Sequence, residues 1–313
     1  MSSRVLRYLI AAAVVAGVAR FIVLRTRRPR APPVVTELWV YPLKSCQGIR
    51  MSSVELTPQG VKYDREWCVG DSEMGTILTQ RDQPRLSLVS CAIDETRQEM
   101  VINAPGMPPL LVSMNADFSR EASMTPIQWT VPRHGRSQGL AAAAWFAKFL
   151  SVPSACLLRS ETPCEPSSHT MHYPVTALTD RGHMQDFSTL HVISQESLLW
   201  LRKRLPAASK AGADVARWRP NVVVSGTPRA FDEDTWVKFV IGGVFMRTAK
   251  PCGRCSVPAV VPETGKSDPA YQPIVALREE RTAFYPHQAE RNMEGAATWP
   301  MFGTHLAKLS LNE

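Results

Sequence analysis

Two cysteines near the carboxyl end, Cys252 and Cys255, stand at a spacing that is typical of metal and redox sites. A structural zinc site needs a second pair of cysteines or histidines, and the other cysteines form no pair at short spacing. A thioredoxin-like redox pair should open a helix, which Pro258 and Pro262 disfavour here. What remains is a thiolate in a proline-stiffened loop that could bind a metal, with two ordinary loop cysteines as the alternative.

The neighbours of Cys255 agree with a metal-binding thiolate. Arg254 places a positive charge beside the sulfur, and a soft thiolate suits a soft or high-valent transition metal. A second possible ligand pair, His169 and His172, has no acidic or cysteine partner at ligand spacing. We therefore expect these two residues to be solvated loop histidines.

The signatures of several enzyme classes are missing from the sequence. It contains no G-x-G-x-x-G, no H-E-x-x-H and no G-x-S-x-G. Gly265-Lys266-Ser267 resembles the end of a phosphate-binding loop, but Val260 occupies the position of that loop's first glycine. We therefore exclude Rossmann dehydrogenases, zincins, α/β-hydrolases and P-loop kinases.

Polar residues cluster where apolar segments end. The segment 34–40 alternates as a strand does and leads into a loop with Lys44 and Ser45, and a second strand over 66–69 directly follows Arg65. The remaining elements are predicted as strands at 190–193, 222–225, 236–241 and 244–248 and as helices at 138–150 and 194–204. Glycines between the last two strands predict a tight hairpin, whose second strand leads to the cysteine pair.

The composition indicates a folded, strand-rich protein. The chain has 313 residues, of which 44% are hydrophobic and 20% are charged, and its 25 prolines outnumber its 17 glycines. These proportions are typical of globular, loop-rich domains, and the length allows one large or two medium domains. We predict a mainly β protein with a few helices, in the α+β class.

The net charge of +8 comes almost entirely from the amino-terminal end. Seven arginines and no acidic residue precede residue 31, which leaves 29 basic residues nearly balanced by 28 acidic ones. No basic face interleaved with aromatic residues follows, so we predict no nucleic-acid binding. The odd count of seven cysteines argues against a disulfide framework and for a reducing compartment.

The amino-terminal segment 8–24 is apolar apart from Arg20 and predicts a short transmembrane helix, with 17 residues spanning roughly 25 Å. Four arginines follow this segment and two precede it, so the positive-inside rule places the body on the cytosolic side. A cleaved secretory signal, ending near Ala19, and a mitochondrial presequence are the alternatives.

Six short motifs, in the same order, resemble those of the MOSC proteins and most of all those of the mitochondrial amidoxime-reducing component family. They are ELWVYPLKSC at 37–46, YDREW at 63–67, TQR with PRL at 79–86, LHVIS with ESL at 190–198, RWRPN at 217–221, and GRC with PETG at 253–265. The motifs extend along nearly the whole chain after the amino-terminal segment.

This resemblance implies a MOSC β-barrel-like domain with an associated MOSC N-terminal β domain, preceded by the transmembrane helix. We expect the signal-anchor helix and linker at 1–33, the N-terminal β domain at 34–164 and the MOSC domain at 165–313. Relatives continue for a further strand-forming segment beyond the region of Pro300, so we expect a MOSC domain that is short at its C-terminus. That expectation leaves the closure of the barrel open.

The resemblance also implies that the body binds a molybdenum pyranopterin cofactor (Mo-molybdopterin). Cys255 matches the molybdenum ligand and so the catalytic centre, with Cys252 as a neighbour and not a co-ligand. The residues that match positions lining the pterin and its phosphate are Lys44, Ser45, Arg65, Ser188, Arg219 and Arg254. Guanidinium forks, a lysine charge and a hydroxyl are groups that suit an anionic phosphate.

The implied activity is the reduction of N-hydroxylated compounds of the amidoxime type. Electrons would come from a cytochrome b5-type donor and its NADH-dependent reductase, and the body would face the cytosol from the mitochondrial outer membrane. One alternative is a MOSC module that binds or transfers the cofactor or sulfur without reductase activity, with no pyridoxal phosphate binding expected. Another is a membrane-tethered interaction protein with a decayed site. Two departures, Val261 in place of an acidic residue and no proline after Ser188, bear on the shape of the pocket.

Overall fold

The computed structural model describes residues 31–128, 131–163, 181–282 and 300–308. Pro33–Glu313 form one compact unit. The predicted anchor at 8–24, the pair His169 and His172, and the domain boundary predicted after residue 164 lie outside the described residues. Among the helices within the described ranges, none is both long and apolar enough to cross a membrane.

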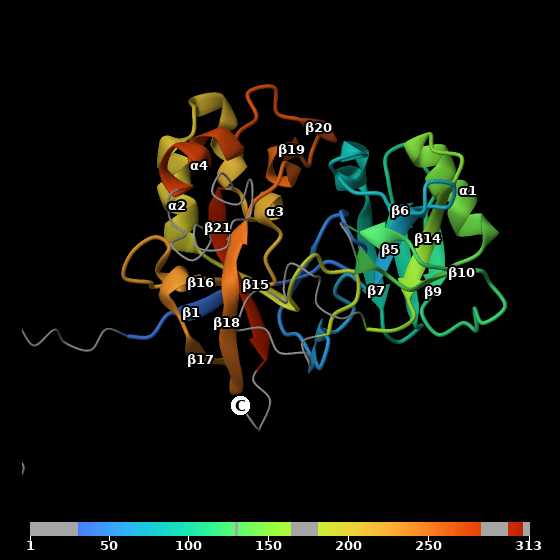
Figure 1. Ribbon diagram of the computed structural model, residues 1–313, viewed down its shortest axis with the longest axis horizontal. Coiled ribbons are helices and arrows are strands. Elements are labelled where there is room, and N and C mark those ends of the chain that lie inside the picture. The colour runs from blue at the N-terminus through green and yellow to red at the C-terminus, as the bar shows by residue number, and fades with distance from the viewer. Residues whose placement is uncertain (1–30, 129–130, 164–180, 283–299, 309–313) are drawn as a thin grey trace, which may run out of the picture. The chain divides into compact units, whose positions relative to one another are not determined.

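A seven-stranded sheet, in the order β17-β18-β21-β15-β16-β1-β2, carries the segment that ends in the two cysteines. Its strands are β1 (Val34–Val40), β2 (Ile49–Met51), β15 (Leu190–Ser194), β16 (Val222–Ser225), β17 (Lys238–Ile241), β18 (Val244–Gly253) and β21 (Met301–Lys308). The helical segments of this part are α2 (Gln195–Arg204), η2 (Ala207–Ala213), α3 (Val215–Trp218), η3 (Asp232–Thr235), η4 (Val257–Ala259) and α4 (Ile274–Arg281). Figure 1 shows α2 and α4 together at one end of the sheet.

The strands β15 and β16 run parallel because α2 connects them. All five residues of β15 are buried, as expected for a strand in the interior of a sheet. Ser194 caps α2 by accepting a hydrogen bond from the backbone N–H of Ser197 at 3.1 Å. This strand, cap and helix lie where the sequence predicts them, to within one residue.

A second seven-stranded sheet, in the order β10-β13-β14-β5-β6-β11-β12, forms a separate group of strands. Its strands are β5 (Trp67–Asp71), β6 (Thr76–Ile77), β10 (Ser123–Met124), β11 (Ile127–Gln128), β12 (Val131–Pro132), β13 (Gly135–Ser137) and β14 (Ala155–Ser160). Smaller sheets are formed by β7 (Ser90–Asp94), β8 (Glu99–Asn103) and β9 (Leu110–Ser113), by β3 (Leu56–Thr57) and β4 (Gly60–Val61), and by β19 (Val260–Val261) and β20 (Lys266–Ser267). The two helical segments here are η1 (Pro84–Leu88) and α1 (Leu140–Leu150).

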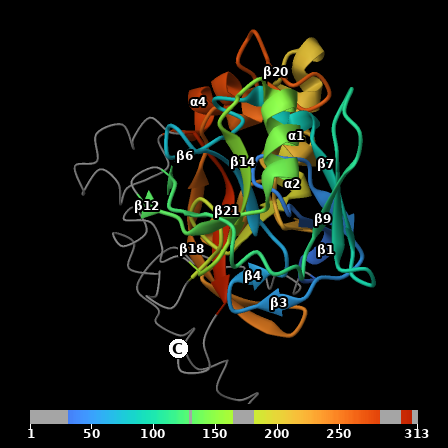
Figure 2. The same ribbon diagram turned by 90° about the vertical axis from the view of Figure 1, so that its right-hand side faces the viewer.

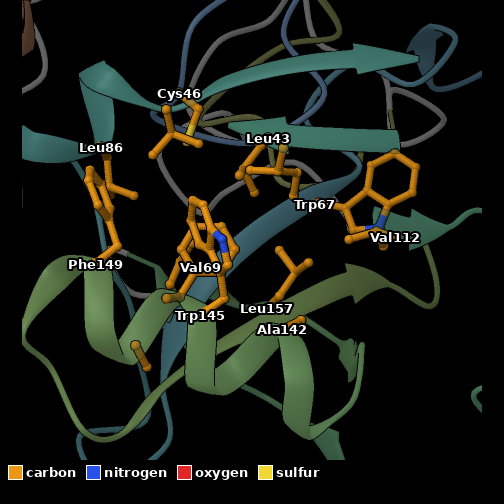
Figure 3. Close-up of a cluster of buried hydrophobic side chains, with 14 of the residues drawn as sticks. Leu43, Cys46, Trp67, Val69, Leu86, Val112, Ala142, Trp145, Phe149 and Leu157 are labelled. Atoms are coloured by element: carbon orange, nitrogen blue, oxygen red, sulfur yellow. The ribbon is translucent and has the colours of Figure 1, made fainter. Parts of the chain in front are cut away.

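The helix α1 covers β14, as Figure 2 shows, and its apolar face closes the larger hydrophobic core. In this core Trp145 of α1 lies beside Val69 of β5, and Phe149 of α1 lies beside Leu86 (Figure 3). Leu43 and Cys46, from the loop after β1, belong to the same cluster and are fully buried. The loop that carries Lys44 and Ser45 is therefore held by the core on both sides of these two residues.

Three features of the fold differ from the sequence-based expectation. The second strand of the predicted hairpin extends to Gly253, so Cys252 lies in a strand and not in a loop. The proline-rich segment after Cys255 forms a single 3-10 turn, η4, and then a short strand. The helix expected from residue 138 begins at Leu140.

Strands from both sides of the domain boundary predicted after residue 164 pair in one sheet. The strands β1 and β2 precede this boundary, yet β1 pairs antiparallel with β16, with Leu38 opposite Val222. The segment after Pro300 supplies β21, which lies between β18 and β15 in the interior of the sheet. Within the described residues, β17 and β2 are the two edge strands of this sheet, and they do not pair with each other.

Gly303 of β21 allows two buried strands to approach each other closely. Its backbone is left-handed, at φ +74°, and a Cβ placed there would lie 2.4 Å from Nε2 of His191 and 2.7 Å from the carbonyl oxygen of Val192. Real carbon atoms do not approach these groups so closely, and the backbone carbonyl cannot move aside. The close packing of β21 against β15 therefore requires glycine at this position.

We predict that Gly303→Ala lowers the free energy of unfolding by about 2–5 kcal/mol, because it adds both a left-handed backbone cost and an overpacked contact. Gly106→Ala is the matched control, since Gly106 has φ +75° and nothing within 4 Å of its added Cβ. The control should lose only about 1–2 kcal/mol. Urea denaturation followed by tryptophan fluorescence measures both, and equal losses would show that the approach of the strands is not the cause.

Candidate functional site

Lys44 and Ser45 lie in the loop that follows β1. Ser45 has a left-handed backbone, at φ 66°. The Nζ atom of Lys44 is buried and donates hydrogen bonds to the carbonyl oxygen of Met184 at 2.7 Å and to Oδ1 of Asp186 at 2.6 Å. Burial lowers the pKa of Lys44, and the charge of Asp186 opposes that effect. Lys44 thus ties the first loop to the segment that precedes β15.

Arg65 and Arg219 stack on the same aromatic ring, that of the buried Tyr41. Their guanidinium carbons lie 4.2 Å and 4.4 Å from the centroid of the ring. Arg65 donates to both carboxylate oxygens of Asp64, at 2.6 Å and 2.7 Å, and to the carbonyl oxygen of Arg219 at 2.9 Å. Arg219 donates to the carbonyl oxygen of Cys46. The fold therefore brings two predicted phosphate-binding residues together.

The charge of Arg219 is not matched by a direct ion pair. Burial and, to a smaller extent, the charge of Arg65 lower the pKa of Arg219 to about 10. Within the described part of the chain, no salt bridge joins Arg219 to a carboxylate, while Asp64 already pairs with Arg65. A partly buried guanidinium without an acidic partner loses some of its hydration, and an anionic ligand would compensate that loss.

Backbone strain coincides with the predicted cofactor residues. Ser45, Arg65 and Arg219 have φ values of 66°, 51° and 55°. Each left-handed residue other than glycine costs on the order of 1–2 kcal/mol, so a fold retains such residues where the surrounding structure or a function requires them. Three of the predicted positions share this rare conformation, which supports a common site.

Ser188 lies just before β15, and its hydroxyl is engaged within the protein. Its Oγ donates to the carbonyl oxygen of Leu190 at 2.8 Å and lies 2.9 Å from Nδ1 of His305. The ring of His305 stacks on Phe187 with centroids 5.0 Å apart. The structure therefore places Ser188 beside the partly buried His305, while its predicted contact with a pterin stays a prediction.

Cys255 lies two residues beyond the end of β18 and is partly exposed. Its side chain interacts with the charged side chain of Arg81. Burial lowers the pKa of Arg81, but the charges of Cys255 and Asp186 raise it above its ordinary value. Arg81 belongs to the motif at 79–81, but the sequence by itself assigns it no role. The signal was present, but only the fold shows that Arg81 faces the predicted metal ligand.

Arg254 turns toward Cys252 and away from Cys255. Its Nη1 donates to the sulfur of Cys252 at 3.0 Å, and its Nη2 donates to the carbonyl oxygen of Trp218 at 2.9 Å. Burial raises the pKa of Cys252, but the charge of Arg254 and the interaction with the side chain of His191 outweigh it and lower that pKa to about 6. Among the described residues, no group of three or more His, Cys, Asp or Glu side chains could hold a metal ion.

Comparison with known proteins places the chain in a family. The sequence model described as MOSC N-terminal beta barrel domain matches residues 33–153, and the one described as MOSC domain matches residues 179–307. The chain is 32% identical to Mitochondrial amidoxime reducing component 2 of Rattus norvegicus, over 82% of this chain and 75% of that protein. It belongs to the MOSC-domain proteins of the mitochondrial amidoxime reducing component family.

Two further relatives of this MOSC-domain protein carry different names. Mitochondrial amidoxime-reducing component 1 of Mus musculus is 31% identical, over 90% of this chain and 80% of that protein. Molybdenum cofactor sulfurase of Bos taurus is 27% identical, over 80% of this chain but 29% of that protein. The resemblance in the six motifs is therefore confirmed as a family relationship.

Both matched domains of this MOSC-domain protein contribute to the candidate site. The residues within the first domain model are Lys44, Ser45, Arg65 and Arg81, and those within the second are Ser188, Arg219, Arg254 and Cys255. Contacts that cross between the two sets include Lys44 with Asp186, Arg65 with Arg219, and Arg81 with Cys255. The site therefore depends on the packing of the two domains.

We predict that Asp186→Asn lowers the free energy of unfolding by about 1–2 kcal/mol at neutral pH, because it removes the acidic partner of the buried Lys44. The loss stays below the roughly 3–5 kcal/mol of a fully buried pair, since the Asp186 side chain is 49% exposed. Although burial raises the pKa of Asp186, Lys44 and Arg81 hold it well below its usual range.

This stabilisation is present above the unfolded-state pKa of about 3.9 and is lost as the pH falls below it. The difference between wild type and Asp186→Asn should therefore shrink below about pH 4. Urea denaturation at several pH values measures it. Glu55→Gln is the control, since Glu55 pairs with Lys62 at the surface and should show no such difference. A pH-independent difference at Asp186 would argue against the ion pair.

Proposed function

We propose that this protein is a molybdenum-cofactor-dependent reductase of N-hydroxylated compounds of the amidoxime type. In this proposal Cys255 is the thiolate ligand of molybdenum, and the loop with Lys44 and Ser45 binds the anionic part of the pterin together with Arg65 and Arg219. The names of the relatives support the substrate class, and their MOSC domains support the relation to the molybdenum cofactor.

The observation that carries the proposal is the charge of Arg219, which is partly buried and has no ion pair with a carboxylate in the described part of the chain. It lies beside Arg65 on the ring of Tyr41 and reaches the carbonyl oxygen of Cys46, next to Ser45. Two guanidinium groups and a neighbouring hydroxyl are a donor set that fits a phosphate. The thiol of Cys255, beside the guanidinium of Arg81, fits a soft metal that needs a single protein ligand.

When bound, the cofactor would supply two electrons for the removal of oxygen from an N–O bond, with two protons taken up and water released. The residues of this chain would bind and orient the cofactor and keep its surroundings ordered. Arg81 would hold the thiolate of Cys255 in place. We propose a cytochrome b5-type donor with an NADH-dependent reductase as the source of electrons, and a small N-hydroxylated molecule as the substrate.

We also propose attachment to the mitochondrial outer membrane through the segment 8–24, with the body facing the cytosol. The support is the apolar, arginine-flanked sequence of this segment and the mitochondrial names of the relatives.

A second candidate function is the binding or transfer of the cofactor or of sulfur without reduction of a substrate. The relationship to Molybdenum cofactor sulfurase of Bos taurus favours it, since that protein aligns with 80% of this chain. The cofactor-binding residues would be the same in both cases. A turnover assay therefore separates the two functions.

We predict that Cys255→Ser abolishes molybdenum binding by the full chain, because a serine hydroxyl is a poor substitute for a soft thiolate. Wild-type protein from cofactor-replete cells should contain molybdenum and release a fluorescent oxidised pterin. Cys156→Ser, a buried cysteine of β14, is the control that should keep both. Wild-type protein without molybdenum would end the reductase proposal. Bound metal without turnover of an amidoxime by reduced cytochrome would favour the second function.

We predict that Arg219→Gln weakens retention of the pterin by about 10- to 100-fold, as expected from the loss of roughly 1.5–3 kcal/mol of charge-assisted hydrogen bonding. Arg219→Lys should recover only part of this loss, because it keeps the charge without the fork. Arg229→Gln is the control, since the side chain of Arg229 is 72% exposed and lies 3.7 Å from the carboxylate of Asp232, outside the candidate site. The readout is pterin per protein after gel filtration, and unchanged retention in Arg219→Gln would place the phosphate elsewhere.

A further inference from the structure

Cys252 is the cysteine of the pair that the proposed function leaves without a role. It lies at the end of β18, is 6% exposed, and stands three residues before Cys255. Its sulfur accepts a hydrogen bond from Nη1 of Arg254 at 3.0 Å and also interacts with the side chain of His191. The sulfur also lies 3.7 Å from the carbonyl oxygen of Gly253. The hydrogen bond that it accepts from Arg254 is the shorter of these two contacts.

Arg254 is held at three points around this sulfur. Besides Cys252, its guanidinium donates to the carbonyl oxygen of Trp218 at 2.9 Å, and its backbone N–H donates to the carbonyl oxygen of Pro300 at 2.8 Å. Its guanidinium carbon also lies 5.2 Å from the centroid of the Trp218 ring. Because both the side chain and the backbone of Arg254 are fixed, the chain direction into Cys255 is fixed as well.

The charges around Cys252 favour an anionic sulfur. Arg254 has no ion pair with a carboxylate in the described part of the chain, so this sulfur is its available anionic partner. His191 faces it from β15 with a pKa that burial lowers to about 4, so that its imidazole is neutral at pH 7. Lys250 faces it from β18 and, with a pKa that burial lowers to about 8, still carries a positive charge at that pH.

The strand β21 also contributes to this arrangement. Because Gly303 has no side chain, the ring of His191 can pack directly against its backbone. A Cβ at position 303 would lie 2.4 Å from Nε2 of His191. The neighbouring His305 is partly buried and its ring centroid lies 5.5 Å from that of His191. Burial and the charges of Lys250 and Arg254 keep the pKa of His305 well below its ordinary value, so it adds no charge at pH 7.

We infer that Cys252 is a positioning residue whose sulfur, as the anionic partner of Arg254, fixes the turn that presents Cys255 to the metal. The inference rests on the proposed function, in which Cys255 is the molybdenum ligand. The two cysteines then have separate roles. The sulfur of Cys252 orients the segment that leads to Cys255, and the sulfur of Cys255 binds the metal. Arg254 then acts on the cofactor through the position of Cys255.

The first test compares Cys252→Ala, Cys252→Asp and Cys156→Ser in the full chain with wild type. Loss of a residue that orients a metal ligand typically costs 10- to 100-fold in metal affinity, so Cys252→Ala should retain about a tenth of the molybdenum or less. Cys252→Asp restores an anion beside Arg254 and should recover about half or more. Its electron paramagnetic resonance signal from molybdenum in the partly reduced protein should match that of wild type, because Cys252 is not a ligand.

A second test needs no cofactor and addresses folding directly. Cys252→Ala leaves the partly buried guanidinium of Arg254 without its sulfur partner, whereas Cys252→Ala/Arg254→Met removes the charge as well. In the cofactor-free full chain, the double variant should therefore unfold at a higher temperature than Cys252→Ala alone. If the effects of the two substitutions on the unfolding temperature simply add, the pair does not interact and the inference is overturned.

The outcomes separate this inference from the proposed function. Wild type without molybdenum, or a Cys255→Ser variant that keeps it, contradicts the proposed function. If wild type binds molybdenum through Cys255 but Cys252→Ala matches wild type in metal content and spectrum, only the positioning role fails. The positioning role also fails if a folded Cys252→Asp variant retains no more metal than Cys252→Ala.

Discussion

The carboxylate of Asp64 joins the segments on which the candidate site is built. Asp64 is fully buried and accepts hydrogen bonds from the backbone N–H of Tyr41, the guanidinium of Arg65 and the side-chain amide of Asn221. These partners belong to the end of β1, the turn before β5 and the start of β16. A buried charge must keep its hydrogen-bonding partners, so none of the three segments can move without exposing the carboxylate to a large desolvation cost.

Positive charge exceeds negative charge around this carboxylate. Asp64 compensates Arg65, but Arg219 stacks on the same ring of Tyr41 and has only carbonyl oxygen as a direct partner in the described structure. Left-handed backbone at Ser45, Arg65 and Arg219 adds conformational cost at the same place. A fold that accepts both strain and uncompensated charge in one region is prepared for an anionic ligand, and the bound anion would recover part of the electrostatic cost.

The two cysteines illustrate how surroundings separate residues of the same type. Cys252 belongs to a strand and lies against Arg254 and His191, whereas Cys255 stands beyond that strand and faces Arg81. Spacing alone treats the two sulfurs as equivalent. In the proposed site the two sulfurs differ in burial and in their partners, and so in their roles. The sulfur of Cys252 lies within the sheet, and that of Cys255 lies where the two domains meet.

Local patterns in the sequence were sufficient for β1, β16, α2 and the hairpin of β17 and β18, because alternation, capping and turn residues act between close neighbours in the chain. The family motifs added the identity of the residues expected at the site. Only the tertiary structure decided that β1 joins the sheet of β16, that Arg81 faces Cys255, and that Arg254 turns back to Cys252. These contacts depend on how distant segments pack and on where buried charges find partners, and no local pattern in the sequence encodes either.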